Sequence, residues 1–171
     1  MISRIAVALA GALFALALVL ALGACSPPLD FRLDPSFDDA SAEAIVQAAR
    51  EWNAVTNESH KITFDGDSWY VEKTSPTAGP WAGITHRSKR LIRLKPPPLA
   101  VSYRVLALHE LGHALGLNHL CRYAGALGDV VDGAPECDPA NPLGVMSPYG
   151  SADAITERDL QECRNAGACD P

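Results

Sequence analysis

The chain has 171 residues, of which 48% are apolar, and it carries 14 Lys and Arg against 20 Asp and Glu, a formal net charge of −6. That length suits one compact domain. The acidic balance disfavours a nucleic-acid-binding surface. Residues 1–24 include 20 apolar residues, so about 42% of the remaining chain is apolar, which is ordinary for a soluble globular domain and disfavours disorder.

An apolar run without charge dominates the N-terminus. Met1–Arg4 form a short basic start, residues 5–22 carry no charge, and Gly23 and Ala24 are small residues before a cysteine. This pattern predicts an export signal. A transmembrane helix is the alternative interpretation, because the length of the run reaches the lower limit for crossing a bilayer. The alanine-rich composition and the small residues at the end favour the signal.

The four residues Leu22-Gly23-Ala24-Cys25 resemble the lipobox of bacterial lipoproteins. The resemblance implies that Cys25 carries diacylglycerol and a third acyl chain, which would anchor the exported domain firmly to a membrane. Ser26 after the cysteine implies the outer membrane or cell surface, if the host is Gram-negative. The expected organisation is a signal peptide that is removed, a lipidated cysteine with its tether, and one folded domain, at residues 1–24, 25–28 and 29–171.

Four further cysteines follow the lipobox: Cys121, Cys137, Cys163 and Cys169. An even number of cysteines in an exported chain predicts two disulfides. Three connectivities exist, and we favour Cys121 with Cys137 and Cys163 with Cys169 because both loops are short. Free thiols or metal ligands are the alternative. None of the four forms a C-x-x-C pair, which weakens the metal interpretation.

The first part of the exported chain predicts one helix among strands. Phe31–Leu33 predicts a short strand. Acidic residues followed by apolar residues at three-and-four spacing predict an amphipathic helix over residues 39–54. Strand-forming residues between turn residues predict β-structure at Lys61–Asp65, Trp69–Lys73 and Trp81–Leu94.

Two more helices follow. The proline run Pro96–Pro98 ends the last strand, and Ala100–Leu117 predicts a helix with almost no polar face, which should be central and buried. Thr156 and Asp159 form a capping pattern that predicts a final short helix to about Asn165. Helix, strands, helix, loop and helix is the order of an α+β fold.

A histidine motif lies on the second predicted helix, where residues 109–119 read HELGHALGLNH. His109 and His113 are four residues apart, so they lie on one helical face, about 40° apart, and both can reach one metal ion. Zinc is the natural candidate. Glu110 lies beside such an ion rather than on it, in the position of a general base that deprotonates a zinc-activated water.

A third ligand requires the helix to end. In a continuous helix His119 would lie about 240° around from His113 and would face away from the ion. Gly116 can adopt the left-handed conformation that ends a helix and turns the chain back. Three neutral imidazoles then leave the fourth zinc position open to water. A purely structural zinc site is the alternative, and Glu110, which coordinates nothing in this scheme, argues against it.

Residues His109 to His119 match every fixed position of H-E-x-x-H-x-x-G-x-x-H, so the sequence resembles the metzincin clan of zinc endopeptidases. Gly144–Tyr149 resembles the Met-turn of this clan, with Met146 under the metal. The order of elements over about residues 29–166 resembles a small matrixin-like catalytic domain. The resemblance implies a small twisted mixed β-sheet packed with three helices, the central one carrying the zinc motif.

The function implied by the resemblance is a lipid-anchored zinc endopeptidase with one catalytic Zn²⁺. It would hydrolyse peptide bonds with Glu110 as general base. A protein or peptide substrate would lie extended along an edge strand near Trp81–Arg87. Tyr149 could line the specificity pocket, and no nucleic acid is expected as a partner.

Other interpretations stay open. One is a catalytically silent surface module that binds zinc and a partner with a metzincin-like fold. A second is a thermolysin-like peptidase in which Glu136 replaces the third histidine, although Gly116 favours His119. His86 is expected in the substrate groove or at the surface rather than as a fourth ligand. Calcium ligands in the loop after the motif are less expected than solvated carboxylates, because no calcium-loop spacing is present among Asp129, Asp132 and Asp138.

Overall fold

The computed structural model describes residues 29–79, 81–97, 102–123, 129–138, 140–148 and 152–170. The expected signal peptide, Cys25 with its tether, and Tyr149 lie outside these residues. Within the described ranges, no helix has both the length and the apolar character needed to cross a membrane.

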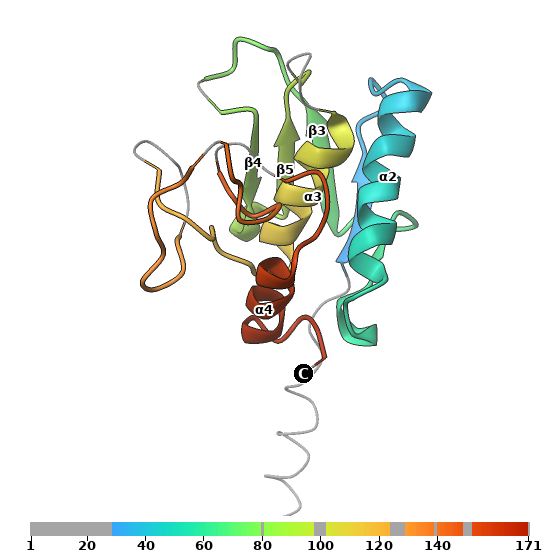
Figure 1. The fold of residues 1–171 in the computed structure, drawn as a ribbon. Coiled ribbons are helices and arrows are strands. Elements are labelled where there is room, and N and C mark those ends of the chain that lie inside the picture. The colour runs from blue at the N-terminus through green and yellow to red at the C-terminus, as the bar shows by residue number, and fades with distance from the viewer. Residues whose placement is uncertain are drawn as a thin grey trace, which may run out of the picture.

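Five strands form one mixed sheet (Figure 1). The strands are β1 (Leu29–Leu33), β2 (Ile62–Thr63), β3 (Trp69–Lys73), β4 (Gly83–His86) and β5 (Leu91–Leu94). Their order across the sheet is β2-β1-β3-β5-β4. The first four strands in this order run parallel, and β4 runs antiparallel to β5. The antiparallel strand therefore forms one edge of the sheet.

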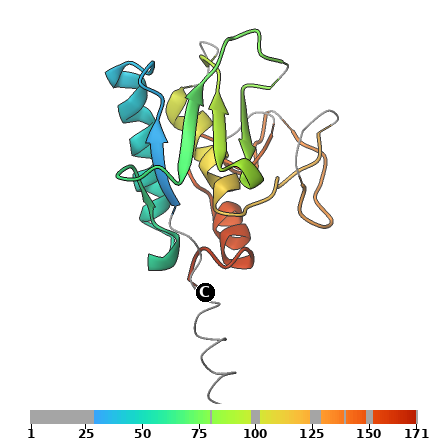
Figure 2. The same ribbon diagram turned by 180° about the vertical axis from the view of Figure 1, so that it is seen from behind.

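Three α-helices accompany the sheet: α2 (Asp39–Asn53), α3 (Tyr103–Ala114) and α4 (Glu157–Asn165). Figures 1 and 2 show α2 and α3 on one face of the sheet, with no helix drawn over the other face of the described sheet. The expected α+β architecture, a small mixed sheet with three helices and the histidine motif on the central helix, is confirmed.

Helix α2 packs closely against α3. Asp38 caps its N-terminus by accepting a hydrogen bond from the Ser41 backbone amide. Its buried face consists of Ile45, Ala48, Ala49 and Trp52. Trp52 is fully buried and donates its indole N–H to Leu108 O at 2.9 Å. This bond satisfies the polar atom of a large buried side chain and fixes how α2 lies on α3.

Helix α3 is buried over most of its length, from Leu106 to Gly112. It begins later than the sequence predicts, because Ser102 caps the helix by accepting from the Val105 amide. On the partly exposed side, Arg104 makes a two-pronged ion pair with Glu51 of α2 at 2.7 and 2.8 Å. The metal-site motif is therefore carried by a helix that is held on several sides.

The segment Trp81–Leu94 differs from the prediction of a single stretch of β-structure. It folds as β4 and β5, joined by the short 3₁₀ helix η2 (Arg87–Lys89) and by Arg90 in the left-handed region at φ 49°. A second short 3₁₀ helix, η1 (Glu58–His60), was also not predicted, and β2 covers only the middle of Lys61–Asp65. The sequence does not predict the turn between β4 and β5, because residues 87–90 contain no glycine or proline, the residue types that most clearly indicate a turn.

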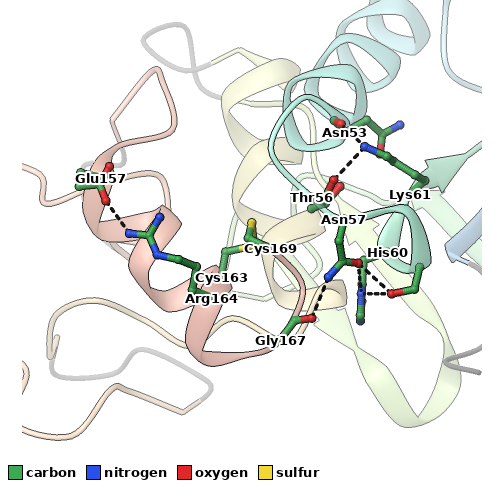
Figure 3. The surroundings of a disulfide bond; sticks show 11 residues. Asn53, Thr56, Asn57, His60, Lys61, Glu157, Cys163, Arg164, Gly167 and Cys169 are labelled. Carbon is green, nitrogen blue, oxygen red and sulfur yellow. Dashed lines mark hydrogen bonds and ion pairs between the residues drawn. A yellow bond between two sulfur atoms is a disulfide. The ribbon is translucent and has the colours of Figure 1, made fainter. Parts of the chain in front are cut away.

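The structure contains two disulfides, Cys121–Cys137 and Cys163–Cys169, in the local pairing favoured from the sequence. The second closes a short loop after α4, which ties the C-terminal segment to the end of α2 (Figure 3). Asn57 donates its backbone amide to Ala168 O at 3.0 Å and its side-chain amide to Gly167 O at 3.2 Å. Helix α4 is thus anchored at its C-terminal end.

Candidate zinc and catalytic site

Three imidazoles converge at the C-terminal end of α3. The Nε2 atom of His119 lies 3.2 Å from that of His109 and 3.0 Å from that of His113. All three ligand atoms lie within 4.8 Å of one another. The structure therefore brings together the three histidines that the motif predicts.

The turn that brings His119 back depends on Gly116, whose φ is 102°. Leu117 N donates to Gly112 O at 3.0 Å, and Gly116 N donates to His113 O at 3.1 Å. These two bonds form a Schellman motif with Gly116 as its left-handed residue. The helix ends at Ala114 for this reason, and the predicted bend at Gly116 is confirmed.

Backbone carbonyls set the tautomers of two of the rings. His109 Nδ1 donates to Val145 O at 2.6 Å, and His113 Nδ1 donates to Leu117 O at 2.9 Å. A neutral imidazole that donates from Nδ1 has a lone pair on Nε2. The nitrogens that face the centre of the cluster are therefore acceptors, which is the arrangement of metal-bound histidines.

Burial keeps the histidines neutral. It lowers the pKa of His109, and it lowers the pKa of His119 to about 4, with the neighbouring His109 lowering the latter further. Burial also lowers the pKa of His113 to about 2, with both other rings adding to the effect. Zinc binds neutral imidazole, so these shifts favour the ligand form.

The donor set fits a zinc ion. Nitrogen ligands about 2.0–2.1 Å from one tetrahedral zinc lie about 3.3 Å from each other. Two of the Nε2 pairs, at 3.0 and 3.2 Å, are close to that separation. Within the described part of the chain, His119 Nδ1 is buried without a hydrogen-bond partner, so its ring orientation is not set by a carbonyl. Convergent lone pairs repel each other, and a cation between them removes that cost.

Glu110 follows His109 on α3 and is buried, with 3% of its surface exposed. Thr85 of β4 places its hydroxyl 2.7 Å from Glu110 Oε2 and 2.9 Å from Glu110 O. Burial raises the pKa of Glu110 to about 8, although the bond from Thr85 opposes the shift. Gly83 leaves room for the carboxylate, since a Cβ there would lie 2.5 Å from Glu110 Oε1.

Met146 is fully buried below the helix. A Cβ at Gly112 would collide with its sulfur, so the glycine between the two helix histidines lets the thioether approach the backbone of α3. The same turn supplies Val145 O to His109 and Met146 O to the Leu120 amide at 3.1 Å. Met146 thus contacts the helix that carries the histidines, and its supporting role under a metal ion stays a prediction.

Asp159 is a site residue that the sequence analysis did not assign. It is fully buried, and its carboxylate accepts from Val145 N at 3.1 Å and Met146 N at 3.0 Å, as well as from Thr156. The capping pattern with Thr156 predicted its place in α4 but not this contact. Asp159 therefore fixes the turn that orients His109.

His119 is held by a loop closed by a disulfide. Its amide donates to Asp129 O at 2.9 Å, and its carbonyl accepts from Val131 N at 3.0 Å. The Cys121–Cys137 disulfide joins the two sides of this loop. The third ligand thus gains its position from long-range pairing rather than from α3.

The remaining candidates lie elsewhere. Among the described residues, the three histidines form the only group of three or more close ligands. His86 and the loop carboxylates Asp129, Asp132 and Asp138 are therefore not part of a metal group. Glu136 is exposed and lies 3.8 Å from Arg122, so the thermolysin-like arrangement is not supported. Tyr149 lies outside the described residues.

Comparison with known proteins gives two kinds of match. Residues 33–127 match the sequence model of the family described as matrixin. The fold is similar to that of myroilysin, with a TM-score of 0.57 and 11% identity over 81% of this chain and 78% of that chain. It is also similar to high choriolytic enzyme 1, a hatching-enzyme zinc-protease from the medaka fish Oryzias latipes, with a TM-score of 0.51.

The match to high choriolytic enzyme 1 has 15% sequence identity and covers 82% of this chain and 90% of the enzyme's chain. At such identities the likeness establishes the fold alone, and it confirms the metzincin-like architecture. No curated protein sequence matches significantly.

Proposed function

Because the chain belongs to the matrixin family, we propose that it is a zinc-dependent endopeptidase in which His109, His113 and His119 hold one catalytic zinc ion. The observation that carries this proposal is the convergence of three imidazole nitrogens, with a buried carboxyl group at the next residue of α3 after the first histidine. A zinc ion held in this way supplies Lewis-acid chemistry, which polarises a peptide carbonyl and lowers the pKa of water.

Glu110 is proposed as the general base. Burial raises the pKa of Glu110 to about 8, and a zinc cation nearby would lower it again, so that the ionised carboxylate could accept a proton and return it close to neutral pH. Thr85 holds one carboxylate oxygen, which leaves the other free to accept a proton from water and to deliver it to the leaving amine. Burial excludes bulk water from the carboxylate and strengthens its interactions with nearby charge.

Strand β4 is proposed to bind the substrate backbone. It forms the edge of the sheet beyond β5, and no described strand pairs with its outer side. An extended peptide can add to such an edge through main-chain hydrogen bonds. Thr85 belongs to this strand and also contacts Glu110, so a peptide on β4 would run past the proposed base.

The proposed function is tested with purified protein from residue 26 onward, loaded with zinc, and a quenched peptide library. Glu110→Ala should lower kcat/KM by about 10²- to 10⁴-fold, because it removes the general base, while one zinc per chain is retained. Glu157→Ala, at an exposed position of α4, is the control and should stay close to wild type. Equal inactivity of wild type and Glu110→Ala, both with zinc bound, would instead favour the silent binding module.

Lipid anchoring at Cys25 is part of the proposal and rests on the lipobox alone. In a bacterial host, the full chain should partition into detergent after phase separation, and Cys25→Ser should move it to the aqueous phase. Recovery of wild type in the aqueous phase, without acyl mass on its N-terminal peptide, would contradict the anchor.

A further inference from the structure

Arg87 crosses from the edge of the sheet to the end of the zinc-site helix. Its backbone belongs to η2, directly after β4. Its Nε donates to His113 O at 2.7 Å, and its Nη2 donates to Leu117 O at 3.0 Å. These carbonyls lie on the two sides of the Gly116 turn. A planar guanidinium suits this task, because its N–H groups point at two acceptors in a fixed geometry.

One of these carbonyls also orients a zinc ligand. Leu117 O accepts from Nδ1 of His113 at 2.9 Å, in addition to the bond from Arg87. The position of this carbonyl therefore sets both the tautomer and the ring plane of His113. Hydrogen bonds from a charged donor are stronger than neutral ones, so Arg87 is well suited to fix the carbonyl.

His113 depends on such support more than His109 does. His109 is buried inside α3, and its carbonyl partner lies in a turn that Asp159 holds. His113 lies in the last turn of α3 and is only half-buried, and its carbonyl partner belongs to the segment that leaves the helix. The last carbonyls of a helix lack partners within the helix, and a cation near them is favourable.

We propose that Arg87 is a positioning residue that ties the Gly116 turn to the end of β4 and thereby aims the His113 imidazole at the zinc ion. This inference rests on the proposed zinc site. Arg87 links the strand proposed to bind substrate with one proposed metal ligand through a single side chain, and its side-chain hydrogen bonds to described residues do not include Glu110.

The test compares Arg87→Gln with Lys89→Gln in purified protein from residue 26 onward. Both variants remove one positive charge from η2, and the Lys89 side chain makes no hydrogen bond or ion pair with any described residue. Zinc affinity is measured by competition with a chelator. Arg87→Gln should weaken zinc binding by about 10- to 100-fold, as loss of support for a metal ligand does, whereas Lys89→Gln should stay within about twofold of wild type.

Two further measurements distinguish a positioning role of Arg87 from a general loss of folded structure in the variant. The Co²⁺-substituted Arg87→Gln protein should show a shifted d–d absorption spectrum, because the geometry of one ligand changes, while Lys89→Gln should keep the wild-type spectrum. Arg87→Lys keeps the charge but offers a single ammonium to two carbonyls. Its zinc affinity should therefore fall between those of wild type and Arg87→Gln.

Zinc affinity of Arg87→Gln within about twofold of Lys89→Gln, with an unchanged cobalt spectrum, would overturn the inference. The same holds if Arg87→Lys binds zinc as weakly as Arg87→Gln while both metal-free proteins melt as wild type does. Because metal binding is measured without substrate, a wild-type chain that binds zinc but cleaves no peptide would contradict the proposed function and leave the role of Arg87 standing.

Discussion

At the scale of single residues, the contact between Gly112 and Met146 connects the helix to the turn below the histidines. Gly112→Ala would drive a methyl group into the Met146 sulfur, with Trp52 on the other side. Overpacking of this kind costs about 1–3 kcal/mol. We expect this loss in the free energy of unfolding, measured by denaturant titration.

A double-mutant cycle identifies the cause of that loss. Met146→Ala creates space at the point of collision, so Gly112→Ala should cost less in that background than in wild type. Additive losses in the double variant would show that the glycine is required for another reason.

A second prediction at this scale concerns Asp159, whose carboxylate serves three backbone amides, those of Val145, Met146 and Thr156. Asp159→Ala leaves these donors without their acceptor, at about 1–3 kcal/mol for each that stays buried. It also releases the turn that supplies Val145 O to His109. We expect a large loss of stability and weaker zinc binding, whereas Asp153→Ala at an exposed position should change neither.

The convergence of His109, His113 and His119 was predictable from the sequence because it depends on local relations: spacing along one helix and a glycine that ends it. Asp159, Thr85 and Arg87 were not, because each acts on an atom distant in sequence, and no residue type at a fixed spacing announces that contact. Arg87 acts on backbone carbonyls of the motif, which any sequence would present, and Thr85 acts on one backbone carbonyl as well as on the Glu110 carboxylate.

At the scale of elements, the loop between Cys121 and Cys137 carries the backbone that pairs with His119. Replacing both cysteines with serine should lower the free energy of unfolding by about 3 kcal/mol, the cost for a loop of this length. Because His119 loses a restrained partner, zinc affinity should fall as well. Chelator competition on the oxidised wild type and on the double variant measures this.

The other disulfide provides the matched control. Cys163–Cys169 closes a shorter loop and anchors α4 to the end of α2, and the backbone that pairs with His119 lies outside that loop. Its double serine variant should lose stability with a smaller change in zinc affinity. Equal losses of zinc affinity in the two double variants would show that the Cys121–Cys137 loop has no special relation to the third ligand.

The bounds of some helices and strands could be predicted from the sequence, and those of others could not. Helix α2 was predicted nearly to the residue because acidic residues start it and its apolar spacing continues to its end, and α4 because Thr156 and Asp159 form a capping pattern at its start. The division of Trp81–Leu94 into β4 and β5 was not, because Arg90 takes a left-handed conformation that its residue type disfavours. Tertiary contacts, among them those of Arg87, hold that turn.

At the scale of the whole molecule, we expect the two parts that meet at the site to depend differently on metal. The core formed by α2, α3 and the sheet buries large apolar side chains such as Phe31, Trp52 and Leu108 without any contribution from the ligands. The segments that bring in His119 and Met146 add Leu117, Leu120, Val145 and Met146 to this core, and they are also held by a disulfide, by Asp159 and by backbone pairing. Metal removal should therefore loosen the second part without unfolding the first.

Hydrogen exchange with and without zinc checks this prediction. Zinc should raise the melting temperature, with a stabilisation of about 4 kcal/mol when free zinc is a thousandfold above its Kd. After chelation, amides in α2 and β3 should keep their protection, while those at residues 117–122 and 143–147 should exchange faster, because the repulsion among three convergent imidazoles is no longer relieved. Uniform loss of protection across α2, β3 and these two segments would mean that the metal is required for folding of the entire domain.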